Sequence, residues 1–222
     1  MANKKPGDKG LRNTVIGTVV FMVVALSGVV AYSNSSKNAS LPGGTSSKDN
    51  YGIVFNSSGK PQVDIWEDFQ CPICHTFEGI NNSYINELAS GGKVKVVFHT
   101  MSFIGAESVI AANAGACANA EGKFIQFHKA LYEDQSTTEN SGHWNSAAMI
   151  ALGKKVGINS SGFASCVNNS KYSGWVQKIE DSAAKKNVNA TPTVFVNGKE
   201  INRQTQYMDA AAFKAAITSA GA

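Results

Sequence analysis

The chain has 222 residues, of which 43% are hydrophobic and 16% charged, a balance typical of a chain that folds around a packed core. Its formal net charge of +4 comes entirely from residues before position 50, so residues 50–222 sum to zero. A neutral globular part lacks the basic surface that binding to a phosphate backbone requires, and we predict no nucleic-acid partner.

The N-terminal third begins with a basic tail, residues 1–13, followed by an uncharged apolar run at 14–32. As a helix, these 19 residues would be about 28 Å long, close to the thickness of a bilayer core. Because the basic residues precede the run, we expect a single-pass anchor in the cell membrane with its N-terminus in the cytoplasm. The alternative is a cleaved signal peptide, since residues 29–31 resemble a cleavage site. Both predict an extracytoplasmic domain.

After the apolar run, residues 33–50 are rich in serine, asparagine and glycine, which predicts a flexible linker. The folded domain is expected to span residues 51–222. Its β-branched and alternating segments predict strands at 51–55, 62–68, 93–98, 193–196 and 199–201. Helices are expected at 71–89, 106–120, 123–133, 144–156, 171–187 and 208–220. The pattern is that of an α/β fold with an all-helical insertion at about 105–187.

The most informative motif is Cys71-Pro72-Ile73-Cys74, which follows a strand and opens a helix. Two cysteines three positions apart on a first helical turn can close a disulfide with little backbone movement. Cys71 would lie near the free N–H groups and the positive end of the helix dipole, which favours its thiolate. We therefore predict that Cys71 is the nucleophile and Cys74 the buried resolving thiol. The alternatives are a structural bridge and half of a zinc site, which lacks further ligands in the sequence.

Residues 51–220 resemble the DsbA-like branch of the thioredoxin superfamily. The resemblance is carried by WEDFQCPICHTFE at 66–78, by Gly122-Lys123-Phe124 with His128 and Leu131, by TPTVFVNG at 191–198, and by the Ala-rich insertion. It implies a thioredoxin-like fold with Cys71 and Cys74 as the redox pair. It also implies a cis bond before Pro192, which would turn the Thr191 backbone toward the cysteines to pair with an extended substrate. The alternative is an ordinary trans proline at the start of a strand.

With the predicted anchor, the chain is similar to the exported DsbA-like proteins of Gram-positive actinobacteria. The resemblance implies an enzyme, a thiol:disulfide oxidoreductase without a cofactor, that oxidises the cysteines of reduced exported polypeptides. A membrane partner of the DsbB-like or VKOR-like type would reoxidise it. An exported reductase or isomerase and a non-catalytic peptide-binding module are the alternatives.

The chain departs from its relatives at two positions. Many of them have a buried acid six residues before the nucleophilic cysteine, where this chain has Ile65. Asp64, Glu67 and Asp68 lie nearby, but the sequence alone assigns none of them to proton transfer. The residue before Cys74 is Ile73, so no imidazole between the cysteines can stabilise the thiolate, and the direction of electron flow stays open.

The other two cysteines, Cys117 and Cys166, both fall in the helical insertion. In an exported protein an even number of cysteines favours a second bridge, and the resemblance implies a structural disulfide here. Two buried free thiols are the alternative. The histidines are scattered among aromatic residues and are expected to be structural, so no metal site is predicted.

Overall fold

The computed structural model describes residues 39–221. The predicted basic tail 1–13, the anchor 14–32 and the start of the linker lie outside these residues. Among the residues described, no helix combines the length and the apolar character needed to cross a membrane.

A mixed five-stranded sheet forms the centre of the domain, in the order β1-β3-β2-β4-β5. The strands are β1 (Ile53–Phe55), β2 (Gln62–Asp68), β3 (Lys95–Met101), β4 (Thr193–Val196) and β5 (Lys199–Glu200). β2 and β3 run parallel, whereas the other neighbouring pairs are antiparallel. Because β2 lies between two strands and under helices, six of its seven residues are buried, including three acids that each need a partner.

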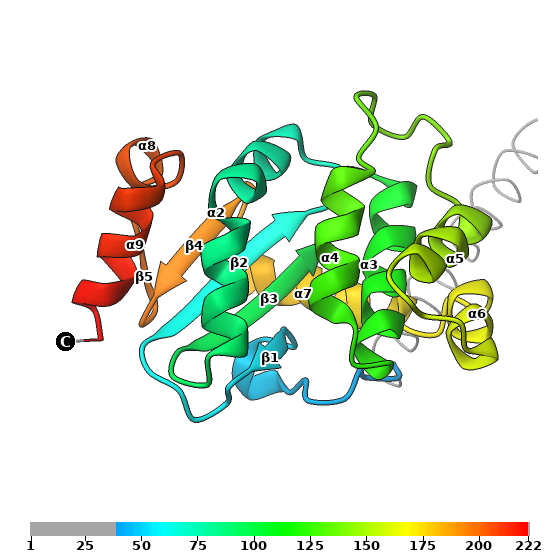
Figure 1. Ribbon diagram of the computed structural model, residues 1–222, viewed down its shortest axis with the longest axis horizontal. Coiled ribbons are helices and arrows are strands. Elements are labelled where there is room, and N and C mark those ends of the chain that lie inside the picture. Colours follow the sequence, from blue (N-terminus) through cyan, green and yellow to red (C-terminus); the bar gives the residue numbers. More distant parts are fainter. Residues whose placement is uncertain (1–38, 222) are drawn as a thin grey trace, which may run out of the picture. The chain divides into compact units, whose positions relative to one another are not determined.

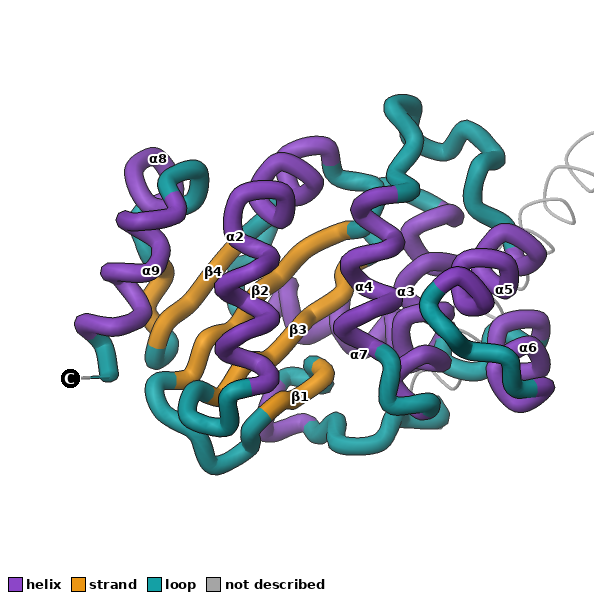
Figure 2. Tube along the Cα trace, viewed as in Figure 1, coloured by secondary structure: helices purple, strands orange, loops and turns teal. Residues whose placement is uncertain are grey.

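The described part of the chain has eight α-helices. They are α2 (Pro72–Ser90), α3 (Ala106–Ala120), α4 (Phe124–Glu133), α5 (Ser146–Lys155), α6 (Ser161–Asn168), α7 (Ser173–Lys185), α8 (Arg203–Gln206) and α9 (Ala210–Ser219). Figure 1 shows α2 in front of the sheet and α7 behind it, and both contact β3. The tube in Figure 2 shows that α5 and α6 lie at the end of the domain opposite α8 and α9. The predicted helical insertion thus corresponds to α3–α7, between β3 and β4.

Three helices differ from the sequence-based prediction, since α6 and the four-residue α8 were not predicted and α9 is shorter than expected. Helix α6 was not predicted, because its eight residues include glycine, serine and asparagine, which weaken the helical pattern. It is nevertheless capped by Ser160, whose side chain accepts a hydrogen bond from the Phe163 N–H at 2.9 Å. The closing helix predicted at 208–220 is shorter, since the side chain of Asp209 caps α9 and separates it from α8.

The folded unit begins before residue 51, where the domain was predicted to start. Residues of the predicted linker pack on the domain because polar partners fix them there. The Asp49 carboxylate pairs with Lys95 on β3, and the Asn119 side chain donates a hydrogen bond to the Gly43 carbonyl at 3.1 Å. Pro42 is buried as well. A low content of apolar residues therefore did not make this segment a free linker.

A disulfide joins Cys117 on α3 to Cys166 on α6 across 49 positions of sequence. This is the pair that was expected to be bridged. The bond holds the short α6 against the largely buried α3, in the part of the insertion that lies far from the sheet in Figure 1.

Candidate active site

Cys71 and Cys74 lie at the start of α2, three residues after the end of β2. The Cys71 N–H donates to the Asp68 carbonyl at 2.9 Å, and the His75 N–H donates to the Cys71 carbonyl at 3.1 Å. Pro72 occupies the first helical turn, where its missing N–H removes no hydrogen bond. Both thiols are free, with Cys71 8% exposed and Cys74 fully buried. Cys71 is therefore the sulfur that an incoming group can reach.

The two thiols differ strongly in acidity. The pKa of Cys71 is lowered to about 6, first of all by a hydrogen bond from the Cys74 thiol. Burial opposes this, whereas the Thr191 side chain and the N–H groups of Cys74 and Ile73 contribute to the lowering. Burial raises the pKa of Cys74 well above its usual value, and the hydrogen bond to Cys71 and the charges of Cys71 and Glu67 add to this rise. The arrangement holds a thiolate at Cys71 and a thiol at Cys74 at neutral pH.

The segment Thr191-Pro192, 120 residues further along the chain, lies against this pair. The Thr191–Pro192 peptide bond is cis. The Cys71 sulfur lies 3.5 Å from the Thr191 carbonyl oxygen, to which it donates a hydrogen bond when it is protonated. This contact follows from the pairing of β4 with β2, in which Thr193 lies opposite Trp66. The four residues predicted to form the site are thus brought together.

Asp68 fixes the loop that carries Cys71. Its carboxylate accepts hydrogen bonds from the Gln70 N–H at 2.9 Å, from the Ser108 hydroxyl at 2.6 Å and from the Ile104 N–H at 3.2 Å. Burial raises the pKa of Asp68 to about 6, with the charge of Cys71 as a smaller contribution, while the three hydrogen bonds oppose the rise. The carboxylate thus ties the active-site loop to α3 of the insertion.

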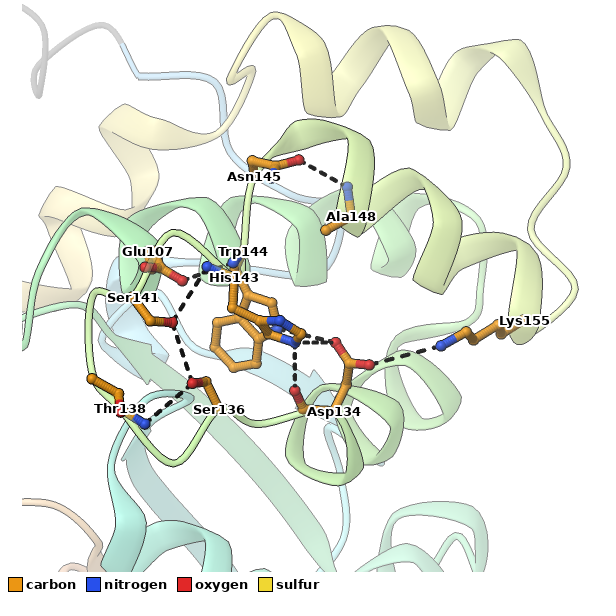
Figure 3. Close-up of polar contacts among 10 residues, drawn as sticks. All are labelled: Glu107, Asp134, Ser136, Thr138, Ser141, His143, Trp144, Asn145, Ala148 and Lys155. Carbon is orange, nitrogen blue, oxygen red and sulfur yellow. Dashed lines mark hydrogen bonds and ion pairs between the residues drawn. The ribbon is translucent and has the colours of Figure 1, made fainter.

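A loop of the insertion, between α4 and α5, supports the same segment from the other side. Gln135 donates to the carbonyls of Phe69 at 2.6 Å and Cys71 at 3.2 Å. The base of this loop is fixed by Asp134, whose carboxylate contacts His143 Nε2 at 3.0 Å and accepts from Trp144 Nε1 at 3.3 Å (Figure 3). These contacts link the position of the Cys71 backbone to the helical insertion.

Charged side chains lie beneath the cysteine pair, where the sequence left the acid unassigned. Ile65 is buried and apolar, and Glu67, two positions along the same face of β2, lies close enough to raise the pKa of Cys74 by its charge. The Glu67 carboxylate contacts His128 Nε2 at 2.5 Å, and Glu78 lies on the opposite side of the same imidazole. Within the described residues, Glu67, Glu78 and His128 form a group that could hold a metal ion, which the sequence-based interpretation missed.

Apolar side chains are exposed around the start of α2. Ile73, between the cysteines, is 55% exposed, and Phe103, in the loop that follows β3, is 53% exposed. Trp66 and Phe69, in contrast, are buried, and the Trp66 ring stacks on His99 with 3.7 Å between centroids. These two aromatic residues therefore belong to the core and offer no surface to a substrate.

A family model described as thioredoxin matches residues 53–218, which cover both the cysteine pair and the cis proline. The chain belongs to the thioredoxin family. Over 149 residues it is 30% identical to disulfide bond formation protein D of Bacillus subtilis (strain 168), a match that covers 63% of this chain and 64% of that protein. The chain therefore matches less than two thirds of the length of this curated relative.

Two solved structures of thioredoxin-family proteins have the same fold. BdbD from Bacillus subtilis has a TM-score of 0.65 and 26% identity over 82% of this chain and 98% of that chain. DsbA from Mycobacterium tuberculosis, in its reduced form, has a TM-score of 0.62 and 28% identity over 82% of this chain and 87% of that chain. The expected resemblance to DsbA-like proteins, and the thioredoxin-like α/β fold with its helical insertion, are confirmed.

Proposed function

We propose that this thioredoxin-family protein is an enzyme, a thiol–disulfide oxidoreductase that oxidises cysteine pairs of exported polypeptides through Cys71 and Cys74. The observation that carries this proposal is the difference between the two sulfurs. Cys71 is slightly exposed, with its pKa lowered to about 6, and Cys74 is fully buried, with its pKa raised. A purely structural bridge has no need of such a difference. The name of the Bacillus relative, disulfide bond formation protein D, supports the same activity.

The proposed reaction begins with the Cys71–Cys74 disulfide. A substrate thiolate attacks the Cys71 sulfur, the bond between the two cysteines breaks, and Cys74 leaves with the electron pair and takes up a proton. The second substrate thiolate then attacks the substrate sulfur that is bonded to Cys71. This forms the substrate disulfide and releases Cys71 as a thiolate. The substrate loses two electrons and two protons and gains a disulfide. The protein gains the two electrons. Cys74 holds one of the two protons, and the other passes to the solvent.

The low pKa of Cys71 favours the oxidase over the alternative reductase or isomerase. A stabilised thiolate stabilises the reduced form, and a protein whose reduced form is stable withdraws electrons from its substrates. Exposed Ile73 and Phe103 would contact unfolded clients, while the Thr191 backbone, beside the Cys71 sulfur, would pair with an extended client strand.

Export and membrane attachment form the second part of the proposal. They rest on the apolar run at 14–32 and the basic residues before it, which lie outside the described part of the chain. A single-pass anchor would hold the domain outside the cytoplasm, where a DsbB-like or VKOR-like membrane partner would reoxidise Cys71 and Cys74. The Cys117–Cys166 disulfide fits an oxidising compartment.

The test is oxidative refolding of a reduced, RNase-type substrate by the full chain, compared with a Cys71→Ala variant. A matched control is Thr76→Ala, an exposed position further along α2. We expect disulfide formation with the native chain and the control, and none above background with Cys71→Ala. Oxidation at the native rate by Cys71→Ala would refute the proposal. A reduction potential near the value of about −270 mV typical of thioredoxin would instead indicate the reductase.

A further inference from the structure

Three ionisable side chains meet in the interior between β2, α2 and α4. They are Glu67, Glu78 and His128, of which Glu67 and His128 are fully buried and Glu78 is 2% exposed. One ligand atom from each lies within 4.8 Å of those of the other two. The imidazole lies between the carboxylates, with Nε2 2.5 Å from Glu67 Oε1 and Nδ1 4.0 Å from Glu78 Oε2.

Each member of this group keeps one buried polar atom without a hydrogen-bond partner among the described residues. These atoms are Glu67 Oε2, Glu78 Oε1 and His128 Nδ1. A buried polar atom without a partner destabilises the fold, and three in one place are unusual in a native core. All three are electron-pair donors when His128 carries its proton on Nε2. A bound cation needs oxygen and nitrogen atoms that are free to donate an electron pair, as these three are.

A route connects this group to solvent. A cleft of about 210 Å³ lies between α2 and α4 and is lined by Glu78, Asn82, Lys129 and Tyr132, among others. Glu78 therefore belongs both to the buried group and to the wall of the cleft. Asn82 donates to Glu78 Oε2 at 2.6 Å, which leaves Oε1 as the free oxygen. An ion from this cleft would reach Glu67 and His128 by way of Glu78, the member of the group that lines the cleft.

We propose that Glu67, Glu78 and His128 form a binding site for a divalent first-row transition-metal ion of the Zn²⁺ type. Two carboxylates balance the charge of the ion, so the loaded site is neutral, as a buried site needs to be. The imidazole favours such an ion over Ca²⁺ and Mg²⁺, which select oxygen ligands. At the tetrahedral angle, two bonds of about 2.0–2.1 Å place the donors about 3.3–3.4 Å apart. His128 Nδ1 and Glu78 Oε2 lie 4.0 Å apart, so these two side chains would close by less than about 1 Å around the ion.

The three protein ligands leave one tetrahedral position open, which a water molecule from the cleft would fill. The site lies one helical turn beyond Cys74, since Cys74 and Glu78 are four residues apart on α2. The proposed disulfide exchange itself requires no metal. The existence of the metal site and the proposed oxidoreductase activity can therefore be tested independently.

The test uses the full chain with Cys71 and Cys74 oxidised, so that no thiolate can bind the metal, and Zn²⁺ as the probe. We expect one equivalent to bind, and a higher melting temperature after loading. Binding should weaken at least tenfold in Glu78→Gln and in His128→Gln. The matched control is Asp134→Asn, which alters an acid–histidine pair at the surface and should leave binding unchanged.

A second probe does not depend on the variants folding. Co²⁺ bound to the oxidised native chain should give the intense visible absorption of a four-coordinate site with nitrogen and oxygen ligands. The proposal is overturned if the native chain binds no Zn²⁺, if folded Glu78→Gln and His128→Gln bind as the native chain does, or if bound Co²⁺ keeps the weak spectrum of the hydrated ion. Loss of binding in Asp134→Asn alone would also overturn it, because it would assign the ion to the surface pair.

Discussion

The acidity of Cys71 depends on the Cys74 thiol, whose hydrogen bond is the largest cause of the lowered pKa. With a pKa of about 6, roughly 10% of Cys71 is thiolate at pH 5, whereas an ordinary cysteine of pKa about 8.5 has roughly 0.03%. The thiolate fraction is thus about 300 times larger, but a thiolate of lower pKa is about 10–20 times less nucleophilic, so the reduced native chain should react with iodoacetamide about 15–30 times faster at pH 5 than an unperturbed thiol. The rate should reach half of its maximum near pH 6.

Replacement of Cys74 tests the cause of this acidity. In Cys74→Ala the donor is lost, so we expect the pKa of Cys71 to rise by at least about one unit. The rate at pH 5 should fall at least about threefold, because the loss of thiolate outweighs its greater nucleophilicity. Cys74→Ser keeps a hydroxyl donor and should fall between alanine and the native chain. The measurement is the pH profile of Cys71 alkylation, followed by mass spectrometry. A half-maximum near pH 8.5 in the native chain, or identical profiles for the alanine variant and the native chain, would refute the reasoning.

Three further predictions concern the reduction potential, the Cys117–Cys166 disulfide and the packing of α6. Because the pKa of Cys71 is lowered, its thiolate stabilises the reduced form above about pH 6, and this stabilisation is lost as the pH falls through 6. The reduction potential should therefore change by about 30 mV per pH unit above pH 6 and by about 59 mV per pH unit below it. A single slope across this range would contradict a pKa of about 6 for Cys71. Opening the 49-residue loop with Cys117→Ala and Cys166→Ala should lower the free energy of unfolding by about 4 kcal/mol in urea denaturation; a loss below about 1 kcal/mol would contradict it. A Cβ at Gly153 would lie 2.3 Å from an aromatic carbon of Phe163 on α6, so Gly153→Ala should lower the free energy of unfolding by about 1–3 kcal/mol. Gly162→Ala, whose new Cβ meets nothing closer than 3.6 Å, should not. Equal melting temperatures of the two variants would contradict this packing.

Much of the fold could be predicted because its signals are local. The alternating run 62–68, the glycines after α2 and Asn197-Gly198 each mark an element or its end. Helix α6 was missed because its stability comes from the Ser160 cap and the disulfide at Cys166, and neither contributes to a hydrophobic period. The segment before residue 51 resembles a linker in sequence because the contacts that fix it, such as that of Asp49 with Lys95, join residues far apart in the chain and leave no local pattern.

Glu67, the buried acid beneath the cysteine pair, could be predicted only in part for the same reason. In β2, alternate residues point to the same face, so Ile65 and Glu67 share the face that α2 covers. The position six residues before Cys71 holds the apolar Ile65, whereas Glu67, the next residue on the same face and nearer the cysteines, is an acid. The alternation alone could have placed Glu67 beneath α2. It could not have placed His128, which comes from α4 in the insertion, or Glu78, which faces the same interior from α2 one turn beyond Cys74. These three residues meet only because the insertion packs on the sheet beside α2, and that packing is a property of the whole fold.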